Sequence, residues 1–194
     1  MWLMSGKTFL LMVSVGLLGL LLGWGLGLQT IPSYSLSPRT VADYLHAVIQ
    51  ADRTFYTQHV VERMEAMLIV TAEEEWRTKQ ALPLPAQFLQ EASRSLDVRG
   101  ASFRYRLISS WPVHSHNKPS SKEEQAALEQ VVEYGEVVEG EVTINDKPYF
   151  KAIYPDRAVS RACVSCHNAH PQSPKRDFKL NDVMGGLVIQ VPLE

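Results

Sequence analysis

The only two cysteines of the 194-residue chain lie three positions apart and are followed at once by a histidine, in Cys163-Val164-Ser165-Cys166-His167. This C-x-x-C-H pattern is the covalent attachment signature of a c-type haem. Two thiols at this spacing can each form a thioether with a porphyrin vinyl group, and the imidazole that follows can bind the iron. The sequence therefore predicts covalently bound haem c, with Cys163 and Cys166 as attachment points and His167 as an axial ligand.

Two other uses of a C-x-x-C pair fit the sequence less well. A structural zinc site needs a second pair of ligands, and neither a second C-x-x-C nor an H-x-x-x-H follows the motif. A thioredoxin-type pair sits at a strand-to-helix junction of a βαβ unit, and no such pattern precedes Cys163. Haem attachment is the interpretation that the local sequence favours.

The N-terminal segment predicts a membrane anchor. Thr8 to Leu28 is an uncharged stretch of about 21 residues, enough to cross a hydrocarbon core of ~30 Å as a helix. A cleaved signal peptide is the alternative, but the apolar run is long and Gln29–Pro32 offers no Ala-x-Ala site. Lys7, the only charge before the span, places the N-terminus in the cytoplasm by the positive-inside rule. We expect residues 1–30 to be an anchor (or signal segment) and residues 31–194 a domain in the periplasm or an equivalent lumen, where bacterial haem attachment takes place.

Composition limits the remaining functions. The net charge of -2, with no basic run, argues against a nucleic-acid partner. About 160 residues outside the anchor suffice for one domain with its own core. The protein is expected to be a single-pass inner-membrane protein.

The elements that position the motif begin with a long helix. Ser37 caps it, Pro38 occupies its first position, and an apolar stripe at helical spacing predicts that it extends to about Gln80 or breaks near Thr71. His59 lies within this stripe, either facing a cofactor or at the solvent edge.

Shorter elements follow the break at residues 82–85. The pattern predicts a helix over 86–96, a half-buried strand over 102–109 and a helix that Ser121 caps and that ends near Gly135. Residues 137–144 and 147–154 form a hairpin around Asn145-Asp146, residues 155–159 form a loop, and residues 187–191 form a last strand. Helices followed by antiparallel strands indicate an α+β domain.

Several segments together resemble the PAS-like c-type haem domains of bacteria, which occur as small anchored proteins and as sensory modules of membrane receptors. The resemblance implies a PAS-like antiparallel sheet with flanking helices and one covalent haem held by Cys163, Cys166 and His167. Some family members supply a cysteine as second axial ligand, and this chain has no third cysteine. The matching pieces are Ala51–Tyr56 with Val60-Val61, Leu84-Pro85-Ala86, Leu107-Ile108-Ser109, Asn117-x-Pro119 with Glu123 and Leu128, and the C-x-x-C-H motif.

The ligand opposite His167 is predicted from position alone. His59 is favoured because it shares a rigid helical stripe with Phe55, Tyr56 and Met67, and His46 is second. Water, an open position and other side chains stay alternatives: His114, His116, His170, Met64, Met67 and Met184. Arg161, two residues before Cys163, is the expected partner of a haem propionate, with Arg53, Arg63 and Arg157 as further candidates, because a guanidinium matches a carboxylate bidentately.

Three functions are compatible with such a site. The first is electron transfer or redox reporting to a protein partner, the second is gas or redox sensing through a separate partner protein, and the third is an enzyme such as a peroxidase. Because no distal His/Arg pair can be identified, the chain is not expected to be an enzyme. A six-coordinate ferrous haem that ignores CO would favour electron transfer, and ready CO binding would favour sensing.

Overall fold

The computed structural model describes residues 35–193. Its contacts divide the chain between Ser35 and Leu36, and the fold described below is that of the second unit, Leu36–Glu194. The predicted membrane anchor, residues 1–30, lies outside the described residues. Among the helices of residues 35–193, none is long and apolar enough to span a membrane.

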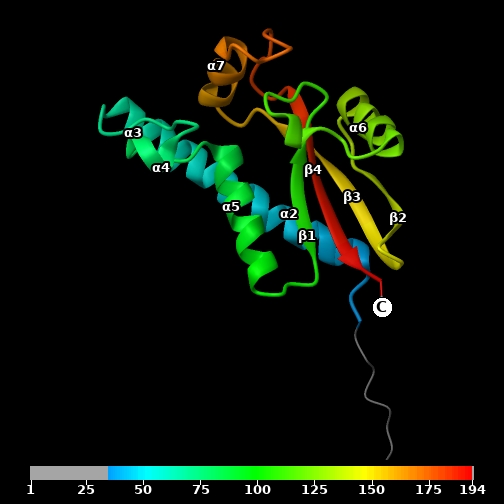
Figure 1. Cartoon of the computed structure of the whole chain (residues 1–194). Helices are drawn as coiled ribbons and strands as arrows, with labels where there is room; N and C mark the ends of the chain where they lie inside the picture. The colour runs from blue at the N-terminus through cyan, green and yellow to red at the C-terminus, as the bar shows by residue number, and fades with distance from the viewer. Residues whose placement is uncertain (1–34, 194) are drawn as a thin grey trace, which may run out of the picture. The chain divides into compact units, whose positions relative to one another are not determined.

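A four-stranded antiparallel sheet forms the centre of the domain (Figure 1). Its strands are β1 (Arg104–Ile108), β2 (Val138–Ile144), β3 (Lys147–Arg157) and β4 (Val183–Pro192), in the spatial order β1-β4-β3-β2. The predicted hairpin is confirmed: Asn145 and Asp146 both have positive φ and join β2 to β3, as a two-residue turn of this kind requires. The predicted loop over 155–159 is partly wrong, because β3 continues to Arg157 in register with β4.

Helices cover both faces of the sheet (Figure 1). On one face, α2 (Pro38–Phe55) and α5 (Pro85–Val98) pack against Tyr105, Leu107 and alternate residues of β3 and β4. On the other face, α6 (Lys122–Tyr134) packs against Ile108, Ile153 and Val188. Successive strand residues point to opposite faces, so these two apolar sets alternate along each strand. The predicted α+β class is confirmed.

The long first helix differs from the sequence prediction. The helical run consists of α2, the π-helical segment η1 (Tyr56–Val61) and α3 (Glu62–Ala66), and it ends well before Gln80. Leu68 has a φ of 56°, which ends the run because a non-glycine residue in this region cannot continue a right-handed helix. A separate short helix, α4 (Trp76–Lys79), follows. Of the two predicted ends, the break near Thr71 lies close to the observed end at Ala66, and the extension to Gln80 is wrong.

The predicted helix caps are present. The Ser37 hydroxyl accepts a hydrogen bond from Thr40 N at 3.0 Å, and the Ser121 hydroxyl accepts one from Glu124 N at 3.2 Å. Gly135 ends α6 in the left-handed conformation that glycine adopts freely. The remaining helices are η2 (Ser115–Asn117) and α7 (Arg161–Ala169), and α7 carries the C-x-x-C-H motif.

Candidate functional site

The C-x-x-C-H motif lies on α7, a nine-residue helix. Ser160 caps it, with its hydroxyl accepting a hydrogen bond from Cys163 N at 3.3 Å. Residues three and four apart share a helix face, so Cys163 lies above both Cys166 and His167. The helix thus presents two thiols and one imidazole on one side, which is the arrangement the motif requires.

Side chains of the first helical run hold the start of α7 in place. Gln58 Nε2 donates to Val159 O at 2.9 Å, and Glu62 Oε1 accepts from Ala162 N at 3.4 Å. These contacts link residues about 100 positions apart in the chain, so the location of the motif depends on the tertiary fold.

A cavity of about 300 Å³ lies beside α7, and Cys163, Cys166 and His167 all line it. This volume is at the lower end of those found for small-molecule and cofactor sites. The first helical run, the segment leading into α5, the end of β1, η2, β3 and the start of β4 supply most of the remaining wall. Most of these side chains are apolar: Val61, Ala72, Leu84, Pro85, Ala86, Leu107, Ile108, Ala162 and Met184.

The orientation of His167 is set by its neighbours on the side of Phe178. Asn168 exchanges two hydrogen bonds with the Phe178 backbone, at 2.9 and 3.0 Å, and the buried Phe178 ring meets the His167 ring edge-on at 6.0 Å. His167 Nδ1 is buried and has no hydrogen-bond partner. Burial, followed by the charges of Arg53 and His170, lowers the pKa of His167, so the imidazole is neutral and able to bind a metal.

A buried ion pair completes the cavity wall. Arg53 of α2 donates from Nη1 to Asp156 of β3, and the two residues are 6% and 8% exposed. Among the described residues that line the cavity, Arg53 is the only arginine or lysine. A polar, charged group therefore faces an otherwise largely apolar space.

Two predicted site residues lie elsewhere. His59 belongs to η1, is exposed and has its ring 4.9 Å from that of Phe55, whereas the cavity is lined from this helical run by Arg53, Val61 and Glu65. Arg161, the first residue of α7, is also exposed and does not line the cavity. The structure thus brings the three residues of the motif together without either of these two.

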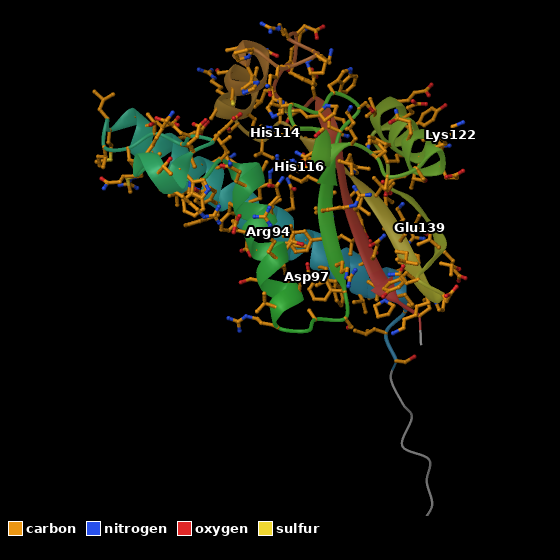
Figure 2. All side chains as sticks on the ribbon, viewed as in Figure 1. Arg94, Asp97, His114, His116, Lys122 and Glu139 are labelled. Carbon is orange, nitrogen blue, oxygen red and sulfur yellow. The ribbon has the colours of Figure 1, made fainter. Side chains whose placement is uncertain are left out.

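Of the other candidates for the second iron ligand, Met184 lines the cavity and is 5% exposed. His46 stacks on Tyr154 at 4.0 Å, and Met67 is exposed. His114 and His116 stack on each other in the loop after β1 (Figure 2), while His114 and His170 both approach Glu74 Oε1 through Nε2, at 3.4 and 2.8 Å. None of these histidines lines the cavity.

These residues fit a covalently held porphyrin. The cavity offers both thiols, an imidazole with a buried, unpartnered Nδ1, and an apolar wall for a planar macrocycle. Cys163 and Cys166 would hold the group through thioethers and His167 would bind its metal. Sequence reasoning missed Asp156 and named Ser109 and Asn117 only as parts of the family resemblance, because no local pattern marks a residue at a strand end or in a loop as facing a distant helix.

Fold and site together define an α+β domain whose lateral cavity is lined by a C-x-x-C-H helix. The family model of the Tll0287-like proteins matches residues 35–192, and the chain belongs to this family. Among solved structures, the crystal structure of the cyanobacterial heme-protein Tll0287 is similar, with 14% sequence identity, coverage of 82% of this chain and 98% of that chain, and a TM-score of 0.46. No curated protein gives a significant match to the chain.

Proposed function

We propose that the protein is a membrane-anchored c-type haem protein that transfers electrons or reports redox state on the periplasmic or luminal side. The observation that carries this proposal is the convergence of Cys163, Cys166 and His167 on one largely apolar cavity. Membership of a family that shares its name with Tll0287, a cyanobacterial heme protein, supports haem as the group bound. The four-stranded antiparallel sheet with helices on both faces supports the PAS-like interpretation of the fold.

The chain's own residues have separate tasks in this proposal. Cys163 and Cys166 attach the macrocycle, so it stays bound in both oxidation states. His167 binds the iron from a position fixed by Phe178 and Asn168, and a fixed ligand lowers the rearrangement that a redox change demands. When bound, the haem supplies a one-electron couple.

The second ligand decides between the proposed function and its alternative. His59 stays the ligand predicted from sequence, but the lining of the cavity favours Met184, a thioether on the rigid start of β4. If no side chain binds there, the haem would serve as a gas or redox sensor that signals to a separate partner protein. Either function would act without catalysis, through a redox or signalling partner.

The anchor and its location belong to the proposal as well. The apolar span of residues 8–28 would hold the protein in the inner membrane as a single-pass protein, with the haem domain outside the cytoplasm.

The first test is covalent attachment. The full chain is co-expressed with a bacterial haem-attachment apparatus, and the product is examined by intact mass and the pyridine haemochrome spectrum. We expect one haem per chain in the wild type and in Ser165→Ala, whose position lies between the cysteines and also lines the cavity. The double variant Cys163→Ala/Cys166→Ala should carry no covalent haem. Absence of haem from the wild type, while a control cytochrome c is loaded in the same cells, would overturn the proposal.

The second test concerns coordination. Ferric and dithionite-reduced spectra are recorded with and without CO for the wild type, Met184→Ala and His59→Ala. A low-spin spectrum that ignores CO and becomes CO-responsive only in Met184→Ala would make Met184 the ligand and support electron transfer. The same change in His59→Ala would restore the sequence prediction, and a CO-responsive wild type would favour the sensor.

A further inference from the structure

The ion pair between Arg53 and Asp156 is buried and lies in the wall of the cavity. Both residues are more than nine-tenths buried, and both line the cavity beside the C-x-x-C-H helix. Removing two charges from water is costly, and a single buried ion pair often stabilises a fold no better than apolar residues of similar size would. Stability alone is therefore a weak reason for this pair.

The donors of Arg53 exceed the acceptors that surround it. A guanidinium has five N–H groups, and Arg53 uses Nη1 to donate to Asp156. Its Nε is buried and has no hydrogen-bond partner. Arg53 has further donors besides the one that meets Asp156, and it lines the cavity from which another acceptor would approach.

The cavity also places Arg53 near the motif. Arg53 and the three motif residues line the same 300 Å³ space, and the charge of Arg53 acts on the His167 imidazole. The wall residues other than Arg53 and Asp156 include one further charged side chain, Glu65, which has the wrong sign to bind an anion. An anionic group entering the cavity would therefore meet Arg53 as its cationic partner.

We propose that Arg53 binds a carboxylate inside this cavity, namely a propionate of the porphyrin, and that Asp156 positions the guanidinium and partly balances its charge. This inference rests on the proposed haem function. It selects Arg53, one of the further candidates of the sequence analysis, over Arg161, because Arg53 lines the cavity and a guanidinium can pair bidentately with a carboxylate there.

The test is the midpoint potential of the haem-loaded full-length protein, compared among Arg53→Gln, Arg53→Lys and Asp156→Asn. A positive charge near the haem favours the ferrous form. Arg53→Gln should therefore lower the potential, Asp156→Asn should raise it, and Arg53→Lys should lie between Arg53→Gln and the wild type. Arg63→Gln, on the same helical run but exposed and outside the cavity, is the matched control and should leave the potential unchanged.

The sign of the shifts separates this role from a structural one. A pair that only holds α2 against β3 would, when broken from either side, admit water to the cavity and move both potentials in the same direction; that result would overturn the proposal. If Arg53→Gln does not fold, Asp156→Asn and Arg53→Lys carry the same test, and a lowered potential in Asp156→Asn contradicts it.

Two further measurements identify which carboxylate Arg53 binds and show whether each variant carries covalent haem. Midpoint potentials are measured in buffer free of carboxylates and again with added acetate. If the wild type and Arg53→Gln differ in potential only when acetate is present, the site binds a free carboxylate, and the proposed pairing of Arg53 with a propionate is wrong. Each variant is first checked by pyridine haemochrome. A wild type without covalent haem would overturn the proposed function, whereas a loaded wild type with no potential shift in Arg53→Gln would overturn only the role of Arg53.

Discussion

Two buried carboxylates, Glu124 on α6 and Asp156 on β3, are each paired with an arginine, yet their surroundings differ. Glu124 is 2% exposed, and both of its oxygens meet cations or donors. Oε2 accepts from Arg106 and from Ser120 N and Oγ, at 2.6 and 2.9 Å for the last two, and Oε1 lies 2.6 Å from Lys151 Nζ. Asp156 has Arg53 as its ion-pair partner, and each of the two groups leaves one buried atom without a hydrogen bond, Arg53 Nε and Glu124 Oε1.

The difference indicates different tasks. The contacts of Glu124 join α6 to β1 and β3 and use both carboxylate oxygens, which is what a network that stabilises the fold requires. The Arg53–Asp156 pair instead lines the same cavity as the three motif residues, whereas the hollow beside Glu124 and Lys151 contains no residue of the motif. Glu124 also takes part in the cap of α6: its N–H donates to the Ser121 hydroxyl, and its carboxylate accepts from the backbone N–H of Ser120.

The largest expected effect is on the stabilising network. Glu124→Ala leaves Lys151 and Arg106 without their shared carboxylate, and breaking a buried ionic network costs about 3–5 kcal/mol. Urea denaturation should show this loss as a lower midpoint, and Glu123→Ala, the exposed neighbour, should leave the midpoint unchanged. The haem potential of Glu124→Ala should equal that of the wild type. A shifted potential in Glu124→Ala would contradict the assignment of Glu124 to the stability of the fold and of Asp156 to the haem site.

Acid should unfold the protein through the same residue. Burial opposes the ionisation of Glu124, but bonds from Lys151 and Ser120 and the charge of Arg106 outweigh it and lower its pKa to about 2. A carboxylate with a lowered folded-state pKa stabilises fully above its unfolded value of 4.5, and that contribution is lost as the pH falls from there through about 2. The loss is on the order of 3 kcal/mol. It should be visible in urea titrations at stepwise lower pH and should be missing from Glu124→Ala.

Packing at the junction of the sheet with α6 gives a smaller effect. A Cβ at Gly186 would lie 2.5 Å from Ile153 Cγ2 and 3.2 Å from Leu128 Cδ1, so Gly186→Ala overpacks this core. Overpacking costs about 1–3 kcal/mol. Thermal and urea unfolding check the loss against Gly140→Ala, where a Cβ meets nothing within 4 Å. If the two variants are equally stable, Ile153 and Leu128 can move to make room for the added Cβ at little cost.

The smallest expected effect is on the opposite face, where α2 meets β3. Tyr154 Oη donates to Asp43 Oδ1 at 2.7 Å, and its ring stacks on His46. Tyr154→Phe removes one hydrogen bond and keeps the stacking, so we expect a loss of about 1 kcal/mol in the free energy of unfolding. The absorption spectrum of the haem should not change. A changed spectrum would place His46 near the haem, in conflict with its absence from the lining of the cavity.

The sequence predicted most elements of the fold because their signals are local. Ser37, Ser121 and Gly135 mark helix ends through bonds and backbone conformations within one turn, and Asn145-Asp146 marks a hairpin in the same way. The end of the first helix was predicted less well, at Gln80 or near Thr71, because no glycine or proline marks the left-handed backbone at Leu68.

The sequence by itself determined the chemistry of the motif: which thiols and which imidazole stand together is fixed by the spacing of Cys163, Cys166 and His167 along one helix. Only the tertiary structure decided what faces them. Arg53, Asp156 and Met184 reach the cavity from α2, β3 and β4, and His59 and Arg161 point elsewhere. The physical reason is that a cavity wall is made by packing segments far apart in the chain, and the direction of a side chain toward such a wall depends on contacts that no local pattern records.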